Sequence, residues 1–118
     1  MDPWYSMGSA DMLEVAHMAV HVGQMTSLDA IGQCFAAVTT NAAKILHLDG
    51  YGLAPGCRAD LVMLQAADPF EAVRLKATRL LVLRAGRIIA RTPERMTTLD
   101  LPGRPASVVP TFAPGSIH

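Results

Sequence analysis

The chain has 118 residues, which allows one domain with a modest core but not a complete (β/α)8 barrel, since such a barrel needs roughly 250 residues. Its 10 basic residues balance 10 acidic ones, and no stripe of Lys and Arg with interleaved aromatic residues is present, so a nucleic-acid partner is not expected. Because 51% of the residues are apolar and only 17% are charged, we expect part of the surface to be covered by a partner.

Three helices are predicted in the first half of the chain. The first is capped by Ser9, begins near Ala10 and keeps apolar residues at helical spacing through about Met25. The second opens at Thr26, where a Thr-x-x-Asp pattern resembles a capping box, and a short third helix covers residues 41–46. All three have broad apolar faces, so each of them needs a packing partner.

A small sheet is predicted in the second half. Residues 59–65 are a compact apolar run between turn residues, which indicates a buried strand. Strands at residues 80–83 and 87–90 should form a hairpin, because Gly86 between them can take a positive φ. From Pro102 onward four prolines and two glycines occur without periodicity, so the tail is predicted to be irregular.

An Asp-Pro pair between the first two predicted strands marks a short helix. Asp68 is a good N-cap and Pro69 suits the first helical position, so residues 70–76 should form two turns. The loop from Gly56 to Asp60 looks like a chemical motif but has a structural explanation. In that interpretation a Pro-Gly turn leads into the strand, and the Asp60 carboxylate satisfies turn or partner amides.

Two histidines share one face of the first predicted helix. His17 and His21 are four residues apart, a spacing that can place two imidazoles on one metal ion. The Glu of a His-Glu-x-x-His motif is absent, and no third ligand of obvious kind lies near. Satisfied buried or interfacial histidines are therefore the default interpretation, and a metal-binding protein that uses this pair is kept as a third hypothesis.

The only tryptophan, Trp4, lies between Pro3 and Tyr5 in a predicted loop. Its ring can offer a flat face to a planar ligand or act as a hydrophobic plug, and the spacing does not distinguish the two. Asp2 is either a turn initiator before proline or an acid. The sequence contains no phosphate loop, dinucleotide fingerprint or Gly-x-Ser-x-Gly elbow, so it carries no stand-alone catalytic set.

The two cysteines, Cys34 and Cys57, fit neither a disulfide framework nor a zinc-ligand spacing, so we interpret both as packing residues in a reducing compartment. No run approaches the roughly 20 apolar residues of a membrane span, and no basic segment precedes an apolar run at the start. These features predict a cytoplasmic protein without a membrane partner.

Six blocks of sequence form a recognisable pattern over roughly residues 1–101. They are Asp2-Pro3-Trp4-Tyr5, Ser9-x-Asp11-Met12-Leu13, His17-Met18-x-x-His21-Val22, Thr40-Asn41-Ala42-Ala43-Lys44-Ile45-Leu46, Gly52-x-x-x-Gly56-x-x-Ala59-Asp60-Leu61-Val62 and Val82-x-x-x-Gly86-Arg87-Ile88-Ile89-Ala90. Together they resemble cytosine deaminases of the metal-dependent amidohydrolase superfamily. The first and third blocks narrow the likeness to cytosine deaminase-like enzymes, whereas the later blocks mark only the superfamily.

This resemblance implies an α/β parent, a (β/α)8 barrel with a side β-sandwich, of which the chain would be the C-terminal piece. Residues 1–48 would be the last barrel loop and the C-terminal barrel helices. Residues 49–101 would be sandwich strands with a short helix, and residues 102–118 an irregular tail rich in Pro and Gly. As an isolated piece the chain would therefore be α followed by β.

The resemblance also implies metal-dependent hydrolysis. Enzymes of this family bind iron or zinc through a His-x-His pair, two further histidines and an aspartate, and a metal-activated water releases ammonia from cytosine or a related ring amidine. None of these ligands lies in the chain, and the aspartate would belong just upstream of Met1. Only Trp4 carries over, as a substrate-binding residue. No catalytic residue and no metal ligand are expected, since His17 and His21 match positions outside the metal set of the family.

Our preferred hypothesis is the C-terminal portion of a cytosine deaminase-like amidohydrolase, inactive by itself. Its open apolar surfaces would favour the missing N-terminal part of the barrel or self-association. The parent would act on a small pyrimidine-like molecule. The alternative is a stand-alone, non-enzymatic α+β interaction module that dimerises through the same apolar faces.

Overall fold

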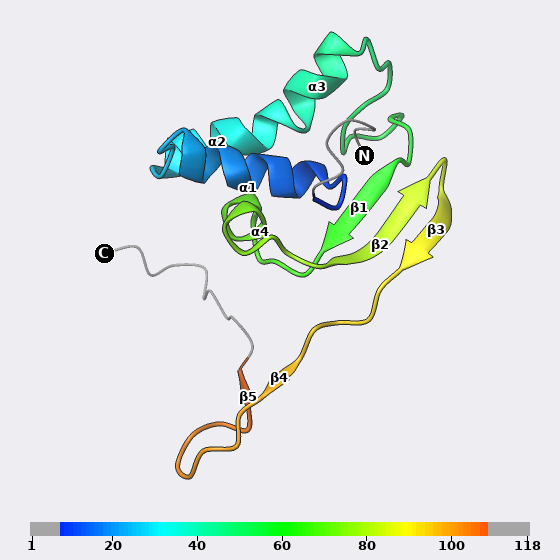
Figure 1. The fold of residues 1–118 in the computed structure, drawn as a ribbon. Helices are drawn as coiled ribbons and strands as arrows, with labels where there is room; N and C mark the ends of the chain where they lie inside the picture. The colour runs from blue at the N-terminus through cyan, green and yellow to red at the C-terminus, as the bar shows by residue number, and fades with distance from the viewer. Residues whose placement is uncertain (1–7, 109–118) are drawn as a thin grey trace.

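The computed structural model describes residues 8–108, and Trp4 lies outside this range. Helices come first and an antiparallel three-stranded sheet follows, so the predicted order of elements is confirmed. In Figure 1 the helices form one body, the sheet extends from it, and a short pair of strands projects away from both. Among the described residues no helix is long and apolar enough to cross a membrane.

Helix α1 spans Met12–Val22, and the residue that caps it differs from the prediction. Asp11 is the N-cap and accepts a hydrogen bond from the Leu13 backbone N–H at 2.7 Å. Ser9 is excluded from that role because Ala10 takes a left-handed conformation, with φ of 57°, which separates it from the first helical turn. The helix ends at Val22, three residues earlier than the pattern indicated, and Gly23 is its C-cap.

Helices α2 and α3 follow, over Leu28–Ala37 and Thr40–Ile45. Ser27 caps α2 by accepting from the Ala30 backbone N–H at 3.2 Å, so the predicted start at Thr26 was one residue early. The two helices are separated at Val38 and Thr39, and the Thr39 hydroxyl donates to the Phe35 carbonyl at 2.7 Å. That bond occupies a carbonyl of the last turn of α2, where the helix stops.

Helix α4, Pro69–Leu75, confirms the predicted Asp-Pro start. The Asp68 carboxylate accepts from the Glu71 backbone N–H, and the Glu71 carboxylate accepts from the Ala67 backbone N–H, both at 2.7 Å. This reciprocal arrangement resembles a capping box and satisfies two donors at the helix start. Lys76 ends the helix in the left-handed region, with φ of 49°.

The sheet has the order β1-β2-β3, with β1 over Leu61–Leu64, β2 over Arg79–Arg84 and β3 over Arg87–Arg91. The predicted β2–β3 hairpin is confirmed. Its two-residue turn is Ala85-Gly86, with φ of 48° and 76°, which is the combination that a type I′ turn requires. A non-glycine residue at the first position is therefore held in a strained conformation by its surroundings.

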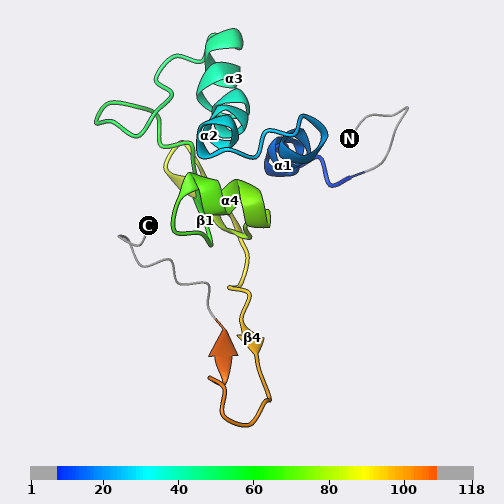
Figure 2. The same cartoon turned by 90° about the vertical axis from the view of Figure 1, so that its left-hand side faces the viewer.

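One expectation about the second half was wrong. Strand β1 was predicted to be buried, yet Val62 and Met63 are 51% and 53% exposed, because no described element covers both faces of the sheet. Within the tail that was predicted to be irregular, Ser107–Val108 (β5) pairs with Thr97–Thr98 (β4) in an antiparallel ladder, while residues 101–106 form neither helix nor strand. Both Figure 1 and Figure 2 show this ladder away from the helices.

The core lies among the helices rather than on the sheet. Its buried members lie on α1, α2 and α4, except for one residue that follows α4. They are Leu13, Ala16, Val20, Ile31, Cys34, Ala72, Val73 and Ala77. Burial of Cys34 confirms its predicted packing role. The helical body is thus the part of the described chain that buries most apolar side chain, and the sheet is attached to it.

We expect Ile31→Ala to lower the free energy of unfolding by about 2 to 5 kcal/mol, because it removes buried carbon atoms and leaves a cavity in the helical core. The matched control is Ile45→Ala, since Ile45 is 76% exposed whereas Ile31 is 4% exposed. The control should change stability by less than about 0.5 kcal/mol. Urea unfolding of both variants measures the difference, and equal effects would contradict the assignment of the core.

Candidate functional site

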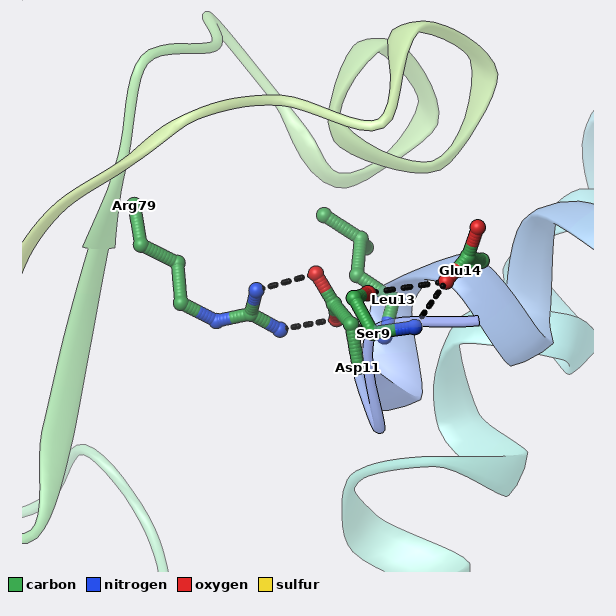
Figure 3. Close-up of polar contacts among 5 residues, drawn as sticks. All are labelled: Ser9, Asp11, Leu13, Glu14 and Arg79. Atoms are coloured by element: carbon green, nitrogen blue, oxygen red, sulfur yellow. Dashed lines mark hydrogen bonds and ion pairs between the residues drawn. The ribbon is translucent and has the colours of Figure 1, made fainter. Parts of the chain in front are cut away.

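An ion pair joins the start of α1 to the start of β2. Its member on α1, Asp11, lies seven residues after Trp4 in the sequence. The Arg79 guanidinium donates through both terminal nitrogens to the two carboxylate oxygens of Asp11. Figure 3 shows the two side chains meeting end to end. The side chains are 34% and 25% exposed, so solvent screens the pair only in part. A two-pronged contact of this kind fixes orientation as well as distance.

The pair changes the acidity of both partners. Hydrogen bonds from Arg79 hold the pKa of Asp11 below its ordinary value of 3.8, against the opposing effect of burial. The same contact raises the pKa of Arg79. Because the folded-state pKa of Asp11 is depressed, its contribution to stability is complete above the unfolded-state pKa and is lost as the pH falls through the folded-state value.

A second set of hydrogen bonds fastens the residues just before α1. The Glu14 carboxylate accepts from the Ser9 hydroxyl at 2.8 Å and from the Ser9 backbone N–H at 3.2 Å. These bonds lower the pKa of Glu14. Ser9 is therefore hydrogen-bonded to the first turn of α1, and Asp11 is paired with the sheet. These contacts fix the position of residues 8–11. Trp4 and Asp2 lie outside the described residues.

The two histidines of α1 lie together. The His17 Nδ1 atom is 2.9 Å from the Val73 carbonyl oxygen of α4, and its Nε2 atom is 3.2 Å from the Nε2 atom of His21. Their ring centroids are 4.5 Å apart, with an edge-to-face inclination of 66°. His17 is half-buried and His21 is exposed. The default interpretation of satisfied, interfacial histidines thus fits His17, and α1 and α4 are linked through its ring.

The loop before β1 serves the fold. The Asp60 carboxylate accepts from the Ala85 backbone N–H at 2.6 Å and pairs with Arg58 at 3.3 Å. The structural explanation given for Asp60 is confirmed. A shallow hollow of about 270 Å³ lies beside this loop and the end of α3, and its lining includes His47, Tyr51, Arg58 and Asp60. The polar groups of Arg58 and Asp60 there are engaged in holding the loop.

The described residues do not fit a metal centre of the type that the resemblance implies. Within residues 8–108, no three or more His, Cys, Asp or Glu side chains gather closely enough to share an ion. His17 and His21 are a pair without a third protein ligand. No step of a metal-assisted reaction can therefore be assigned to this part of the chain.

Residues 1–90 match the family model described as "Amidohydrolase family". The chain belongs to this family. The match includes Trp4, helices α1 to α4, strands β1 and β2 and most of β3, so the predicted resemblance to amidohydrolases is confirmed over the segments that carried it.

Relatives of this amidohydrolase chain include an enzyme of Pseudomonas sp. (strain ADP), N-isopropylammelide isopropyl amidohydrolase. The two are 31% identical over 91 residues, which cover 76% of this chain and 23% of the relative. Among solved structures, 5-methylcytosine deaminase from Klebsiella pneumoniae, liganded with phosphonocytosine, matches with a TM-score of 0.73 and 35% identity over 83% of this chain and 24% of that chain. N-isopropylammelide isopropylaminohydrolase from Burkholderia multivorans matches with a TM-score of 0.71 and 40% identity, covering 76% and 23%. The chain thus spans about a quarter of the length of these relatives.

Two residues of this region were missed by sequence reasoning. Arg79 lies 68 positions from Asp11, and neither spacing nor composition connects the two. Glu71 is buried on α4, where its Oε2 atom accepts from Ala67. A signal for Glu71 was present, since an acid three residues after an Asp N-cap is the sequence mark of a capping box. For Arg79 the only available signal was its position directly before a predicted strand, at residues 80–83.

Replacing Asp11 by Asn separates the two roles of this residue, because Asn is also a good N-cap but cannot pair with Arg79. We expect a loss of about 1 to 2 kcal/mol near neutral pH, as suits a partly exposed, two-pronged charged contact. The loss should begin to shrink as the pH falls below about 4, the ordinary pKa of Asp, and should disappear only after the pH has also fallen through the depressed folded-state pKa of Asp11.

Urea unfolding at several pH values, with Arg79→Gln and the double variant, completes a cycle that isolates the pairing energy. A difference between wild type and Asp11→Asn that stays constant with pH would show that the ion pair is not its source.

Proposed function

We propose that the chain is the C-terminal portion of a hydrolytic amidohydrolase of the cytosine deaminase type, which removes an amino group as ammonia from a ring amidine in a small pyrimidine-like substrate. The observation that carries this proposal is the joint likeness in sequence and fold to 5-methylcytosine deaminase, at 35% identity and a TM-score of 0.73. That relative has been solved with phosphonocytosine and with 5-fluorocytosine.

In this proposal residues 1–48 supply the last loop and the C-terminal helices of a (β/α)8 barrel. Residues 49–101 supply strands and a short helix of a side β-sandwich, and the residues from 102 onward follow these strands as a segment rich in Pro and Gly. The exposed apolar residues of the sheet support this placement, because Val62, Met63 and Ile89 are more than half exposed in the chain alone. Such side chains are suited to contact with the rest of the parent.

The parent would use a divalent ion, iron or zinc, whose chemistry is to activate a water molecule for attack. Because the described residues do not form a set that fits this ion, the proposal assigns its ligands to the part of the parent outside this chain. This chain would contribute one side of the substrate pocket of the parent. Trp4 would lie against the flat face of the pyrimidine ring.

The Asp11–Arg79 pair supports that role from outside the pocket. It fastens the start of α1 to β2, and the Ser9–Glu14 bonds fasten the preceding residues to α1. In the sequence, the segment that contains Trp4 ends directly before residues 8–11. Within the proposal, Asp11 and Arg79 act as positioning residues, since a small displacement of a substrate-binding group costs catalytic rate.

The 118-residue chain alone is expected to release no ammonia from cytosine, with or without added zinc or iron. The physical reason is that one aromatic wall cannot replace the activation of the attacking water. A coupled ammonia assay checks this outcome. Metal-dependent turnover at an enzyme-like rate, of roughly 1 per second or more, would contradict the proposal that the chain is only a portion of the enzyme.

A chimera tests the proposed activity directly. Here the chain replaces the matching C-terminal quarter of the Klebsiella pneumoniae deaminase. We expect the chimera to release ammonia from cytosine. Trp4→Ala should lower its kcat/KM by about tenfold, while Trp4→Phe, which keeps an aromatic face, should retain most of it. A folded, metal-loaded chimera without deaminase activity would overturn the proposal, and equal activities of the two variants would overturn the role of Trp4.

A further inference from the structure

The histidine pair on α1 is not used by the proposed function, and its geometry suits a ligand. His17 and His21 are one helical turn apart, and their Nε2 atoms are 3.2 Å from each other. Two nitrogens that bind one tetrahedral ion at about 2.0–2.1 Å lie roughly 3.3 Å apart. The two potential donor atoms already have the separation that a shared ion imposes.

The surroundings of His17 prepare it to be a ligand. Its Nδ1 atom is 2.9 Å from the Val73 carbonyl oxygen, which can only accept, so Nδ1 carries the proton and Nε2 carries the lone pair. A histidine ligand in metal sites commonly donates its other ring N–H to a backbone carbonyl in this way. Val73 itself is fully buried in the helical core, so the carbonyl that orients the ring is firmly held.

His21 supplies the movable half of the pair. It is exposed, and in the absence of an ion its Nε2–H donates to the Nε2 lone pair of His17. Transfer of that proton to the Nδ1 atom of His21 through solvent would free a second lone pair, with no net change of charge on the ring. A modest rotation of the exposed ring then lets both lone pairs converge on one ion.

The electrostatic field at the end of α1 also favours a bound cation. His17 lies at the middle of α1, and His21 is in its last turn, where the helix dipole favours positive charge. The carbonyl that holds His17 also lies in the last turn of α4.

We propose that His17 and His21 form a two-imidazole site for a divalent transition ion such as Zn²⁺, Ni²⁺ or Cu²⁺, with its other coordination positions open to water or a small ligand. Imidazole nitrogen selects these ions over Mg²⁺ and Ca²⁺, which prefer oxygen. The site is separate from the metal centre that the amidohydrolase family implies, and it does not rest on the proposed deaminase activity. Bound there, an ion would link the end of α1 to α4 through the ring of His17.

The test is a calorimetric titration of the 118-residue chain with zinc chloride, and with magnesium chloride as the negative arm. We expect one zinc ion per chain and no magnesium binding. His21→Gln should weaken zinc binding by more than about tenfold, since it removes one of two ligands. The amide of Gln can still donate to the Nε2 atom of His17, so this variant retains the hydrogen bond and loses only the imidazole. His47→Gln is the matched control and should bind as wild type.

A second readout is the thermal unfolding temperature. Zinc should raise it in the wild type and in His47→Gln, because an ion that binds only the folded state stabilises that state, and it should leave His21→Gln unchanged. Zinc binding of equal strength in His21→Gln, or absence of zinc binding in the wild type, would overturn the site. Neither result bears on whether the chimera deaminates cytosine, so the two proposals fail independently.

Discussion

The carboxylate of Asp11 is the group on which the arrangement of helices and sheet depends. It caps α1 through the backbone N–H of Leu13, and it also pairs with Arg79 at the start of β2. A helix start and a strand start that are far apart in sequence are thus held by one side chain. Because α1 packs against α2 and α4 and β2 is the central strand, the contact fixes the helical body relative to the sheet.

The two halves of the chain differ in how they bury apolar groups. Helices α1, α2 and α4 enclose Val73, which has no exposed surface, whereas β1 and β3 leave Val62 and Ile89 open to solvent. Local contacts along helices form readily, but a three-stranded sheet with open apolar faces gains little by itself. The stability of the sheet therefore depends on its attachment to the helices, and its exposed faces are the natural place for further protein to bind.

Sequence reasoning succeeded where the signal was local. Asp68-Pro69 and Gly86 each determine the conformation of their own neighbourhood, so the start of α4 and the turn after β2 were predicted correctly. Helix starts at Ser9 and Thr26 were misplaced by one or two residues, because several residues in a row can act as caps and only the backbone conformation decides among them. Arg79 was not foreseen as a partner, since nothing local marks a contact made across the fold. The role of Trp4 stays a prediction.

The turn between β2 and β3 depends on a segment that lies well before it in the sequence. The backbone N–H groups of both its residues, Ala85 and Gly86, donate to the segment just before β1, one to the Asp60 carboxylate and one to the Ala59 carbonyl. The segment just before β1 and the β2–β3 turn are therefore held together by hydrogen bonds, although they are separate blocks in the sequence. Exchange of the segment before β1 for one without an acid at position 60 would leave the Ala85 N–H of a strained turn without its side-chain acceptor, so the turn and this segment form one structural unit.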